Sequence, residues 1–471
     1  MADKETALMA HLMRRAGFGA TRDEIEERVA KGYEATVEEL LDPDVFGIPS
    51  VDRDHMFRAF PGIEIPSSPG NGKSNVVYYM LTTKRPLEEK MAFFWHNVFA
   101  TGNSKVDNPT ELVRQIDMFR EHGLGSYHIL LVELAKNPAM LYWLDNTENH
   151  KNAPNENWGR ELLELFSMGV GNYSEQDVYE CSRAFTGWTI ARKIPRLPYG
   201  RFYWSFEYKP EDHDDSEKVF LGHRGRFNGE DIIDIIVRQP ATARFIARHL
   251  YDFFVADEAQ VPAWQHTPPR DLAAINIIAD AFVNSGYDMR STLRVMFNSE
   301  FFKEENVRWA KVKSPVELVV GVLRLAGDWQ APRPGLQPVA DECEYMQQEL
   351  LNPPSVEGWH TGTEWIDSGS LVNRINYAAD RLADIDMPGV QSIIRRIRAR
   401  GTTMSPGDLV ESCLDLIGPM DVADGTRAEL TSVAEQGGEL RWDTEEASAV
   451  SARRVGEVLA FVAASREFQF A

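Results

Sequence analysis

The chain has 471 residues and a formal net charge of −22, from 50 lysine and arginine residues against 72 aspartate and glutamate residues. With 43% hydrophobic and 26% charged residues, its composition is that of a globular protein and excludes global disorder. The acid excess excludes a general nucleic-acid binder and electrostatic attachment to anionic lipid, because both need a basic surface. No run approaches the roughly 20 apolar residues that span a bilayer, so we expect no membrane partner.

The cysteines and the N-terminal segment bear on the compartment. Cys181, Cys343 and Cys413 are far apart and form no CxxC pair, which predicts separate buried thiols and no disulfide framework. Arg14 and Arg15 are followed by the stretch 17–22, which is not an apolar run, so they do not form a twin-arginine signal. We therefore expect a cytoplasmic protein.

Helix signals dominate the first part of the chain. Thr21 and Glu24 have the spacing of a capping box, and Ser174 with Asp177 is a second N-terminal signal. Pro86 suits the first position of a helix, where its missing N–H costs no hydrogen bond. The helices expected from these signals cover residues 21–30, 86–100, 108–123, 126–136, 154–169 and 174–185.

Between residues 187 and 221 the apolar period changes from helical to 2. Phe202, Trp204, Phe206 and Tyr208 would share one face of a strand, and a second short strand fits residues 218–221. This pattern predicts a small β-meander inserted into a helical protein.

Helical patterns resume after the insertion. They are expected over residues 229–238, 240–255, 271–284, 289–298, 315–325, 341–351 and 370–382, with three or four more between 384 and 470. We predict a mainly α protein: a large multi-helix core over residues 1–383, a β-rich insertion at 187–228, and a C-terminal helical cap, the extension 384–471.

Four long strings carry a resemblance to a known family. They are the stretches 11–19 (HLMRRAGFG), 86–97 (PLEEKMAFFWHN), 155–166 (NENWGRELLELF) followed by 184–189 (AFTGWT), and 352–359 (NPPSVEGW). In this order they resemble the bacterial "domain of unknown function 1800" family over about residues 5–383. Trp158 and Gly159 stand where members usually have Tyr-Ala, and this difference leaves the neighbouring carboxylates and arginine in place.

The resemblance implies no established activity. Many members of that family are secreted and are encoded beside a sulfatase-like family of unknown function, which implies a protein partner of that kind. A His-Asp element of the family matches His213 and Asp214 in this chain.

The helix that begins at Pro86 carries the first candidate site. Glu89 and His96 are seven residues apart, hence about 20° apart around the helix axis. A carboxylate orients an imidazole, so His96 is a candidate general base or metal ligand, with Asn97 beside it for substrate binding. The alternative is a core histidine that is hydrogen-bonded to the backbone.

The second candidate lies on the helix expected at 154–169. Relative to Glu156, Arg160 falls at about 40°, Glu164 at about 80° and Glu161 at about 140° around the axis. These carboxylates would line a cleft, where they would bind a divalent metal ion or divide acid and base roles, while Arg160 binds an anionic group. The alternative is a solvated face with i,i+4 ion pairs.

A third candidate is the acidic segment 211–217, which surrounds His213 with carboxylates, including that of Asp214. Such density is relieved by a cation or by solvent, so the segment is either part of the site or a solvated loop.

Candidate substrate-binding residues come from two further patterns. Asn155 belongs to a cluster of asparagines at 146–157 that suits either sugar recognition or turns and caps. Trp188, Trp204 and Trp359 would stack on a saccharide, or would belong to the core.

From these clusters we expect an enzyme, hydrolase- or lyase-like and with or without a divalent metal ion, acting on a small-molecule or saccharide substrate. Its polar cleft would combine His96, the helix carrying Glu156–Glu164 and the pair His213–Asp214. The alternative is a non-enzymatic binding or scaffold protein for a protein partner or a polysaccharide. The burial of His96 and Arg160 separates these two hypotheses.

Overall fold

The computed structural model describes residues 4–64, 66–191, 203–329 and 335–471. Phe202, which was expected to begin a strand, lies outside them. The described part of the chain is mainly α-helical with a few short two-stranded sheets, which confirms the predicted fold class.

The N-terminal half is helical up to the insertion. Its helices are α1 (Lys4–Arg15), α2 (Arg22–Lys31), α3 (Tyr33–Leu41), α4 (Arg53–Ala59), α5 (Pro61–Glu64), α6 (Pro69–Thr82), α7 (Pro86–Val98), α8 (Asn103–Val106), α9 (Pro109–His122), α10 (Tyr127–Lys136), α11 (Pro138–Trp143), α12 (Asn157–Glu164) and α13 (Glu175–Ala184). The capping box of Thr21 with Glu24 is present, and so is that of Ser174 with Asp177.

After the insertion the chain is again helical. The helices are α14 (Gly229–Val237), α15 (Pro240–Phe254), α16 (Leu272–Asn284), α17 (Met289–Asn298), α18 (Glu300–Lys303), α19 (Pro315–Ala326), α20 (Leu336–Tyr345), α21 (Ser368–Ala383), α22 (Pro388–Arg398), α23 (Pro406–Leu416), α24 (Asp424–Gln436) and α25 (Glu445–Ala464). Short 3₁₀ turns occur at Asn146–Glu148, Pro210–Asp212, Val261–Ala263, Glu305–Val307, Gly362–Trp365 and Glu467–Gln469. No described helix has the length and apolarity needed to cross a bilayer.

The strands differ from the predicted meander. Strand β1 (Trp188–Ile190) pairs antiparallel with β2 (Phe206–Tyr208), and β3 (Lys218–Phe220) pairs with β4 (His223–Gly225) in a separate sheet. A third antiparallel pair, β5 (Thr403–Met404) with β6 (Leu440–Arg441), lies in the connections between the C-terminal helices. The alternating aromatic pattern continues through Trp204, but the regular strand begins only at Phe206.

The helix expected at 154–169 is also shorter than predicted. It begins at Asn157 because the Asn155 side chain accepts a hydrogen bond from the Asn157 backbone N–H, which forms a turn ahead of the helix. It ends at Glu164, after which Gly169, at φ 76°, closes a wide turn with a hydrogen bond to the Leu163 carbonyl.

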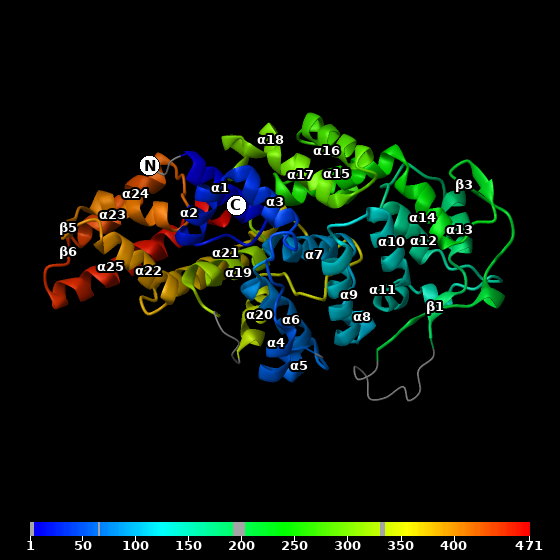
Figure 1. Ribbon diagram of the computed structural model, residues 1–471, viewed down its shortest axis with the longest axis horizontal. Helices are drawn as coiled ribbons and strands as arrows, with labels where there is room; N and C mark the ends of the chain where they lie inside the picture. Colours follow the sequence, from blue (N-terminus) through cyan, green and yellow to red (C-terminus); the bar gives the residue numbers. More distant parts are fainter. Residues whose placement is uncertain (1–3, 65, 192–202, 330–334) are drawn as a thin grey trace.

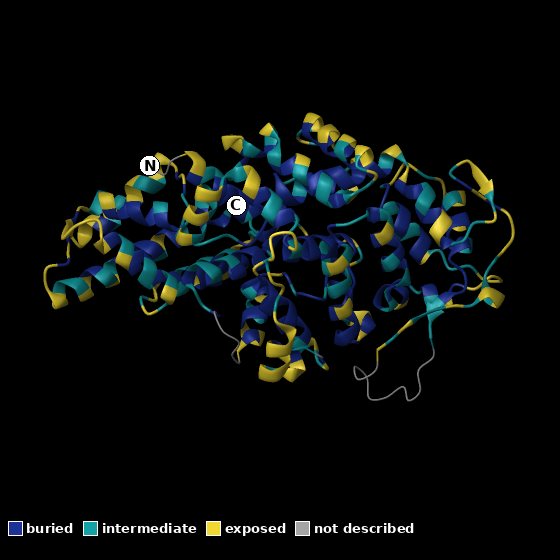
Figure 2. Ribbon diagram, viewed as in Figure 1, coloured by how far each residue is buried: buried dark blue, intermediate teal, exposed yellow. Residues whose placement is uncertain are grey.

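The elements form an elongated body with α7 near its middle (Figure 1). The helices α22–α25 occupy one end, and α13 with β1 and β3 occupies the other. Burial is continuous through the central helices (Figure 2), and Trp95 of α7 is fully buried. The C-terminal extension is joined to the core because α25 packs along α21.

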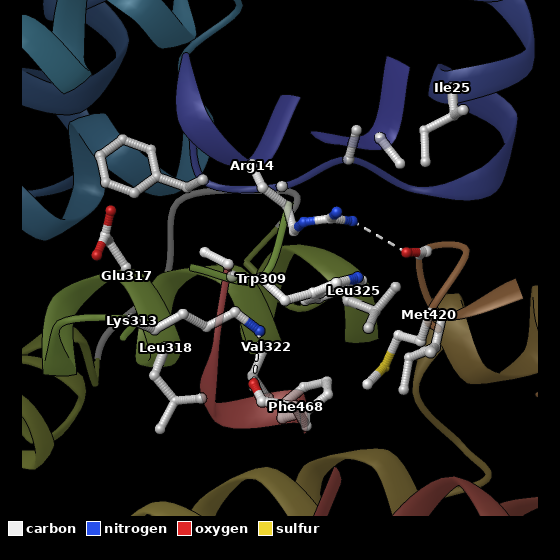
Figure 3. A pocket seen from close by; sticks show the side chains of 18 residues that line it. Arg14, Ile25, Trp309, Lys313, Glu317, Leu318, Val322, Leu325, Met420 and Phe468 are labelled. Carbon is white, nitrogen blue, oxygen red and sulfur yellow. Dashed lines mark hydrogen bonds between the residues drawn. The ribbon is translucent and has the colours of Figure 1, made fainter. Parts of the chain in front are cut away.

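A buried ion pair connects α7 to α19. Lys90 donates to Glu317, and their side chains are 0% and 8% exposed. Glu317 also caps its own helix by accepting a hydrogen bond from the Ser314 backbone N–H at 2.8 Å. Although burial opposes ionisation, Lys90 and Lys311 lower the pKa of Glu317 to about 2. Glu317 lies at one end of a small cavity that Arg14 and Lys313 also line (Figure 3).

We predict that Glu317→Gln lowers the free energy of unfolding by about 3–5 kcal/mol, because it leaves Lys90 charged and buried without its partner. Urea denaturation measures this loss. The double variant Lys90→Met/Glu317→Gln is expected to recover part of it. The control is Glu230→Gln, which removes an exposed partner of Lys136 and should cost less than about 1 kcal/mol. Equal losses in Glu317→Gln and Glu230→Gln would contradict the central role of the buried pair.

Candidate acid–base cleft

Two adjoining cavities, of about 350 and 500 Å³, form one cleft between segments that are far apart in the chain. The larger one lies against the end of α12 and the turn after it, and the smaller one reaches the end of α7. Both are bounded by α15, the segment 259–266 and the loop 354–364; their shared wall consists of Leu165, Val261, Pro262, Trp264 and Glu357. We call this combined space the acidic cleft.

Three carboxylates gather beside the acidic cleft. Glu164 of α12 and Glu357 of the loop 354–364 line it. Both act electrostatically on Glu161, which also belongs to α12. Burial, together with the neighbouring charge of Glu164 and more weakly that of Glu357, raises the pKa of Glu161 to about 7, although Arg160 opposes the shift. Tyr173 donates to Glu164 at 3.0 Å and so holds this carboxylate in place. A carboxyl group that titrates near neutral pH is suited to general acid–base chemistry.

The opposite wall is one face of α15. Burial, and to a smaller extent the positive charge of Arg248, lowers the pKa of His249 to about 3, so its imidazole is neutral. Its buried Nε2 has no hydrogen-bond partner in the described residues, and its ring contacts the Trp264 ring at 4.6 Å. Asp252, one turn further on, accepts a hydrogen bond from the Glu258 backbone N–H at 2.8 Å. Burial raises the pKa of Asp252 to about 6.

Asn97 and Trp359 both line the smaller cavity, as their proposed role in substrate binding requires. His96 does not line it, but its ring meets the ring of Trp359 edge-on at 5.1 Å. His96 Nε2 accepts a hydrogen bond from the Leu351 backbone N–H at 3.2 Å, so the imidazole fastens the following loop to α7. The same loop approaches so closely that a Cβ on Gly358, at φ 86°, would lie 2.5 Å from the Asn97 carbonyl oxygen.

The proposed Glu89–His96 relation is absent. Glu89 instead forms an ion pair with Arg120, with an Oε1–Nε distance of 2.8 Å. Burial lowers the pKa of His96 to about 3, and its buried Nδ1 has no hydrogen-bond partner in the described part of the chain. His96 is thus a neutral, enclosed side chain behind the cleft wall.

Glu156 and Arg160 line neither cavity of the cleft, although Arg160 acts electrostatically on Glu161. The Arg160 guanidinium contacts Glu156 at 3.2 Å and Glu175 of α13 at 2.7 Å, and its side chain is 34% exposed. The i,i+4 pair with Glu156 is the one expected for a solvated face. Because Arg160 turns to Glu175, no ion pair between Arg160 and Glu164 forms within the described residues.

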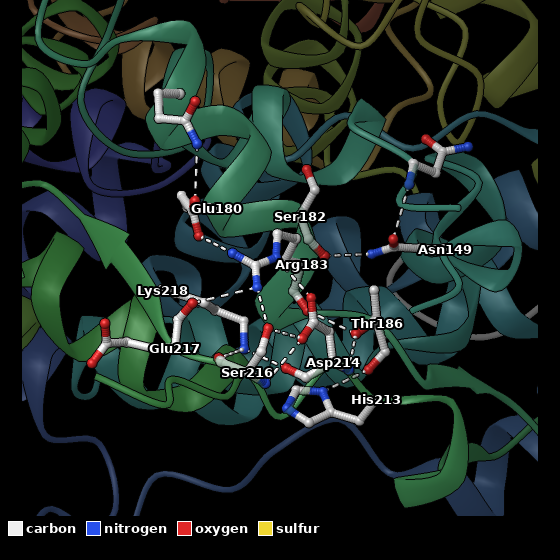
Figure 4. Close-up of polar contacts among 12 residues, drawn as sticks. Asn149, Glu180, Ser182, Arg183, Thr186, His213, Asp214, Ser216, Glu217 and Lys218 are labelled. Carbon is white, nitrogen blue, oxygen red and sulfur yellow. Dashed lines mark hydrogen bonds and ion pairs between the residues drawn. The ribbon is translucent and has the colours of Figure 1, made fainter. Parts of the chain in front are cut away.

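His213 and Asp214 join a different network (Figure 4). Asp214 accepts from Arg183 Nε at 2.7 Å and from the Ser216 backbone N–H at 2.9 Å, and Arg183 also pairs with Glu180. His213 Nδ1 lies 3.0 Å from the Thr186 carbonyl oxygen. These contacts fasten the acidic segment 211–217 to α13. Neither His213 nor Asp214 lines the acidic cleft.

The remaining predicted binding residues lie in turns or in the core. Asn155 connects Asn149 to Asn157 through backbone hydrogen bonds, which is the turn-and-cap interpretation of the asparagine cluster. Trp188 is 2% exposed and donates to Asn228 at 2.9 Å. Trp204 contacts the Tyr142 ring at 5.4 Å and lines a separate open groove of about 990 Å³.

In the ranges that the structure describes, no group of three or more histidine, cysteine, aspartate or glutamate side chains is placed to hold a metal ion. Cys181, Cys343 and Cys413 are buried and free.

His249, Asp252, Trp264 and Glu357 line the cleft, and the sequence interpretation selected none of them. The signal for two of them was the i,i+3 spacing of His249 and Asp252 on a largely apolar helix that also carries Arg244 and Arg248. Glu357 lay inside a conspicuous string, but only the fold brings it to Glu161.

Comparison with known families gives one match. The sequence model of a family described as "Protein of unknown function (DUF1800)" matches residues 11–470. The chain belongs to this family. The match extends past the strings within residues 5–383 and includes most of the C-terminal extension. No curated protein and no solved structure matches the chain.

The raised pKa of Glu161 has a consequence for stability. A carboxyl group with a higher pKa in the folded state than in the unfolded state favours folding less as pH rises through that interval. We predict that Glu161→Gln raises the melting temperature at pH 8, where wild-type Glu161 is ionised, and changes it little at pH 4.5. Thermal denaturation across this pH range tests it.

Glu175→Gln is the matched control, because Arg160 lowers the pKa of Glu175 and its removal should not stabilise the protein at pH 8. A pH-independent effect of Glu161→Gln would show that Glu161 is not held in its protonated form.

Proposed function

We propose that this protein is an enzyme of hydrolase or lyase type that acts by general acid–base catalysis in the acidic cleft. The observation that carries the proposal is that Glu164 and Glu357, from two distant segments, line one hollow and both act electrostatically on Glu161 beside it. In the scaffold alternative, the polar groups would be enclosed and fully paired with no adjoining cavity. Arg160 is instead partly exposed, and His96 and His249 each keep a buried ring nitrogen without a partner in the described residues.

The division of roles follows from the electrostatics. Glu161, which stays partly protonated near neutral pH, gives a proton to the leaving atom of the substrate. Glu164 or Glu357, whose side chains line the cleft, takes the proton from water in a hydrolase or from the substrate carbon in a lyase. These proton transfers need only side chains of the chain itself, so no step is assigned to a metal ion.

The substrate class follows from the lining of the cleft. Trp264 and Trp359 offer aromatic faces, and Asn97 and His249 offer groups that donate or accept hydrogen bonds. The surrounding carboxylates repel anions, which favours a neutral small molecule or saccharide. A cytoplasmic setting belongs to the same proposal, because the three cysteines are free thiols.

The proposal is tested with neutral nitrophenyl glycosides and esters between pH 5 and 9. We expect wild-type turnover to fall as pH rises through about 7, where Glu161 loses its proton. Glu161→Gln should reduce kcat by about 100-fold or more. Glu175→Gln, which removes an exposed carboxylate on the adjacent helix, should leave turnover unchanged. Equal turnover of wild type and Glu161→Gln, or a flat pH profile, would contradict the proposal.

A further inference from the structure

A cavity of about 70 Å³ lies between α1, α19 and the segments 417–420 and 468–471, and it shares no lining residue with the acidic cleft. Arg14 and Lys313 approach it from two sides (Figure 3). Arg14 belongs to the string at residues 11–19, which the proposed function leaves unused. Most of the remaining wall is apolar: Ile25, Leu318, Val322, Leu325, Met420 and Phe468.

The two cations have few partners. Arg14 Nη1 donates to the Gly418 carbonyl oxygen at 3.0 Å, but its buried Nε has no hydrogen-bond partner in the described residues. The Arg14 guanidinium also lies over the Trp309 ring at 4.1 Å. Lys313 donates to the Phe468 carbonyl oxygen at 2.7 Å. Across the described ranges, neither side chain forms an ion pair with a carboxylate.

The surroundings of the cavity carry a surplus of positive charge. Glu317 also lines it, but this carboxylate is already paired with Lys90. Arg374, fully buried behind Lys313, has an Nη1 with no partner in the described residues. Burial is the main reason that the pKa of Lys313 falls to about 7, and the positive charges of Arg14 and Arg374 lower it further. Burial is also the main reason that the pKa of Arg14 falls to about 9. An entering anion would offset this repulsion.

We propose that this cavity binds a small organic carboxylate, with the carboxylate between Arg14 and Lys313 and a short alkyl group against the apolar wall. The volume of about 70 Å³ admits several water-sized groups and excludes ligands as large as a nucleotide. The apolar walls disfavour a fully polar anion such as inorganic phosphate, whose remaining oxygens would lose hydrogen bonds to water. The site is separate from the acidic cleft and does not depend on the function proposed for it.

The test uses the full chain labelled with ¹³C at the methionine methyl groups, since Met420 lines the cavity. Met420→Leu assigns its resonance. Butyrate, butyramide and inorganic phosphate are titrated separately at constant ionic strength. We expect butyrate to shift the Met420 resonance saturably, and butyramide and phosphate to leave it in place. Lys313→Met and Arg14→Gln should each weaken butyrate binding about tenfold or more, because each removes a charge-assisted contact.

Arg238→Gln, which removes an exposed cation on the surface, is the matched control and should bind butyrate as the wild type does. Circular dichroism establishes that each variant is folded. The proposal is overturned if butyrate does not move Met420, if butyramide or phosphate moves it equally, or if folded Lys313→Met binds butyrate with wild-type affinity.

Discussion

The Glu317 carboxylate is the charge on which the centre of this molecule depends. It acts on five buried cations from separate parts of the chain: Arg15, Lys90, Lys311, Lys313 and Arg374. Among the described residues, Lys90 alone forms an ion pair with Glu317; the other four are held by backbone carbonyls, neighbouring side chains or Asp257. Because one carboxylate acts on so many cations, negative charge is scarce in this region. The region lies where four helices meet: α1, α7, α19 and α21. That scarcity explains why Arg14 and Lys313, beside the small cavity, donate to backbone carbonyls and form no ion pair within the described residues.

The acidic cleft has the opposite imbalance. Glu161, Glu164 and Glu357 approach one another without a cation that neutralises all three, because Arg160 is engaged by Glu156 and Glu175. An excess of like charge is costly for folding, and such costs are found where they serve binding or catalysis. The described part of the chain therefore holds a surplus of positive charge around the cavity lined by Arg14 and Lys313, and a surplus of negative charge at the acidic cleft.

Local rules predicted most helices, because their signals lie within a few residues. Asp271 before α16, Asp288 before α17 and the Ser314–Glu317 capping box set three helix starts within one residue of expectation. The cleft was only partly predictable. Asn97, Glu164 and Trp359, which the sequence suggested as site residues, do line the cleft, and their roles there stay predictions. Tertiary packing decides which of these elements meet. Residue spacing in the sequence therefore could not predict that Asp252 lines the cleft or that His213 and Asp214 do not.

The sequence strings that carry the family resemblance have different structural roles. His96 and Gly358 hold the loop 351–359 against α7, one through a hydrogen bond to Leu351 and the other by the absence of a side chain. This loop carries Glu357 and Trp359 into the acidic cleft, so two strings that are more than 250 residues apart act together to form one wall. Arg14 and Arg15 in the first string have no part in that wall; they contribute charge to the centre around Glu317. Lys311 lies between the two regions, since it acts on both Glu317 and Asp252. Lys311 therefore contributes positive charge both to the surroundings of Glu317 and to the wall of the cleft that Asp252 forms.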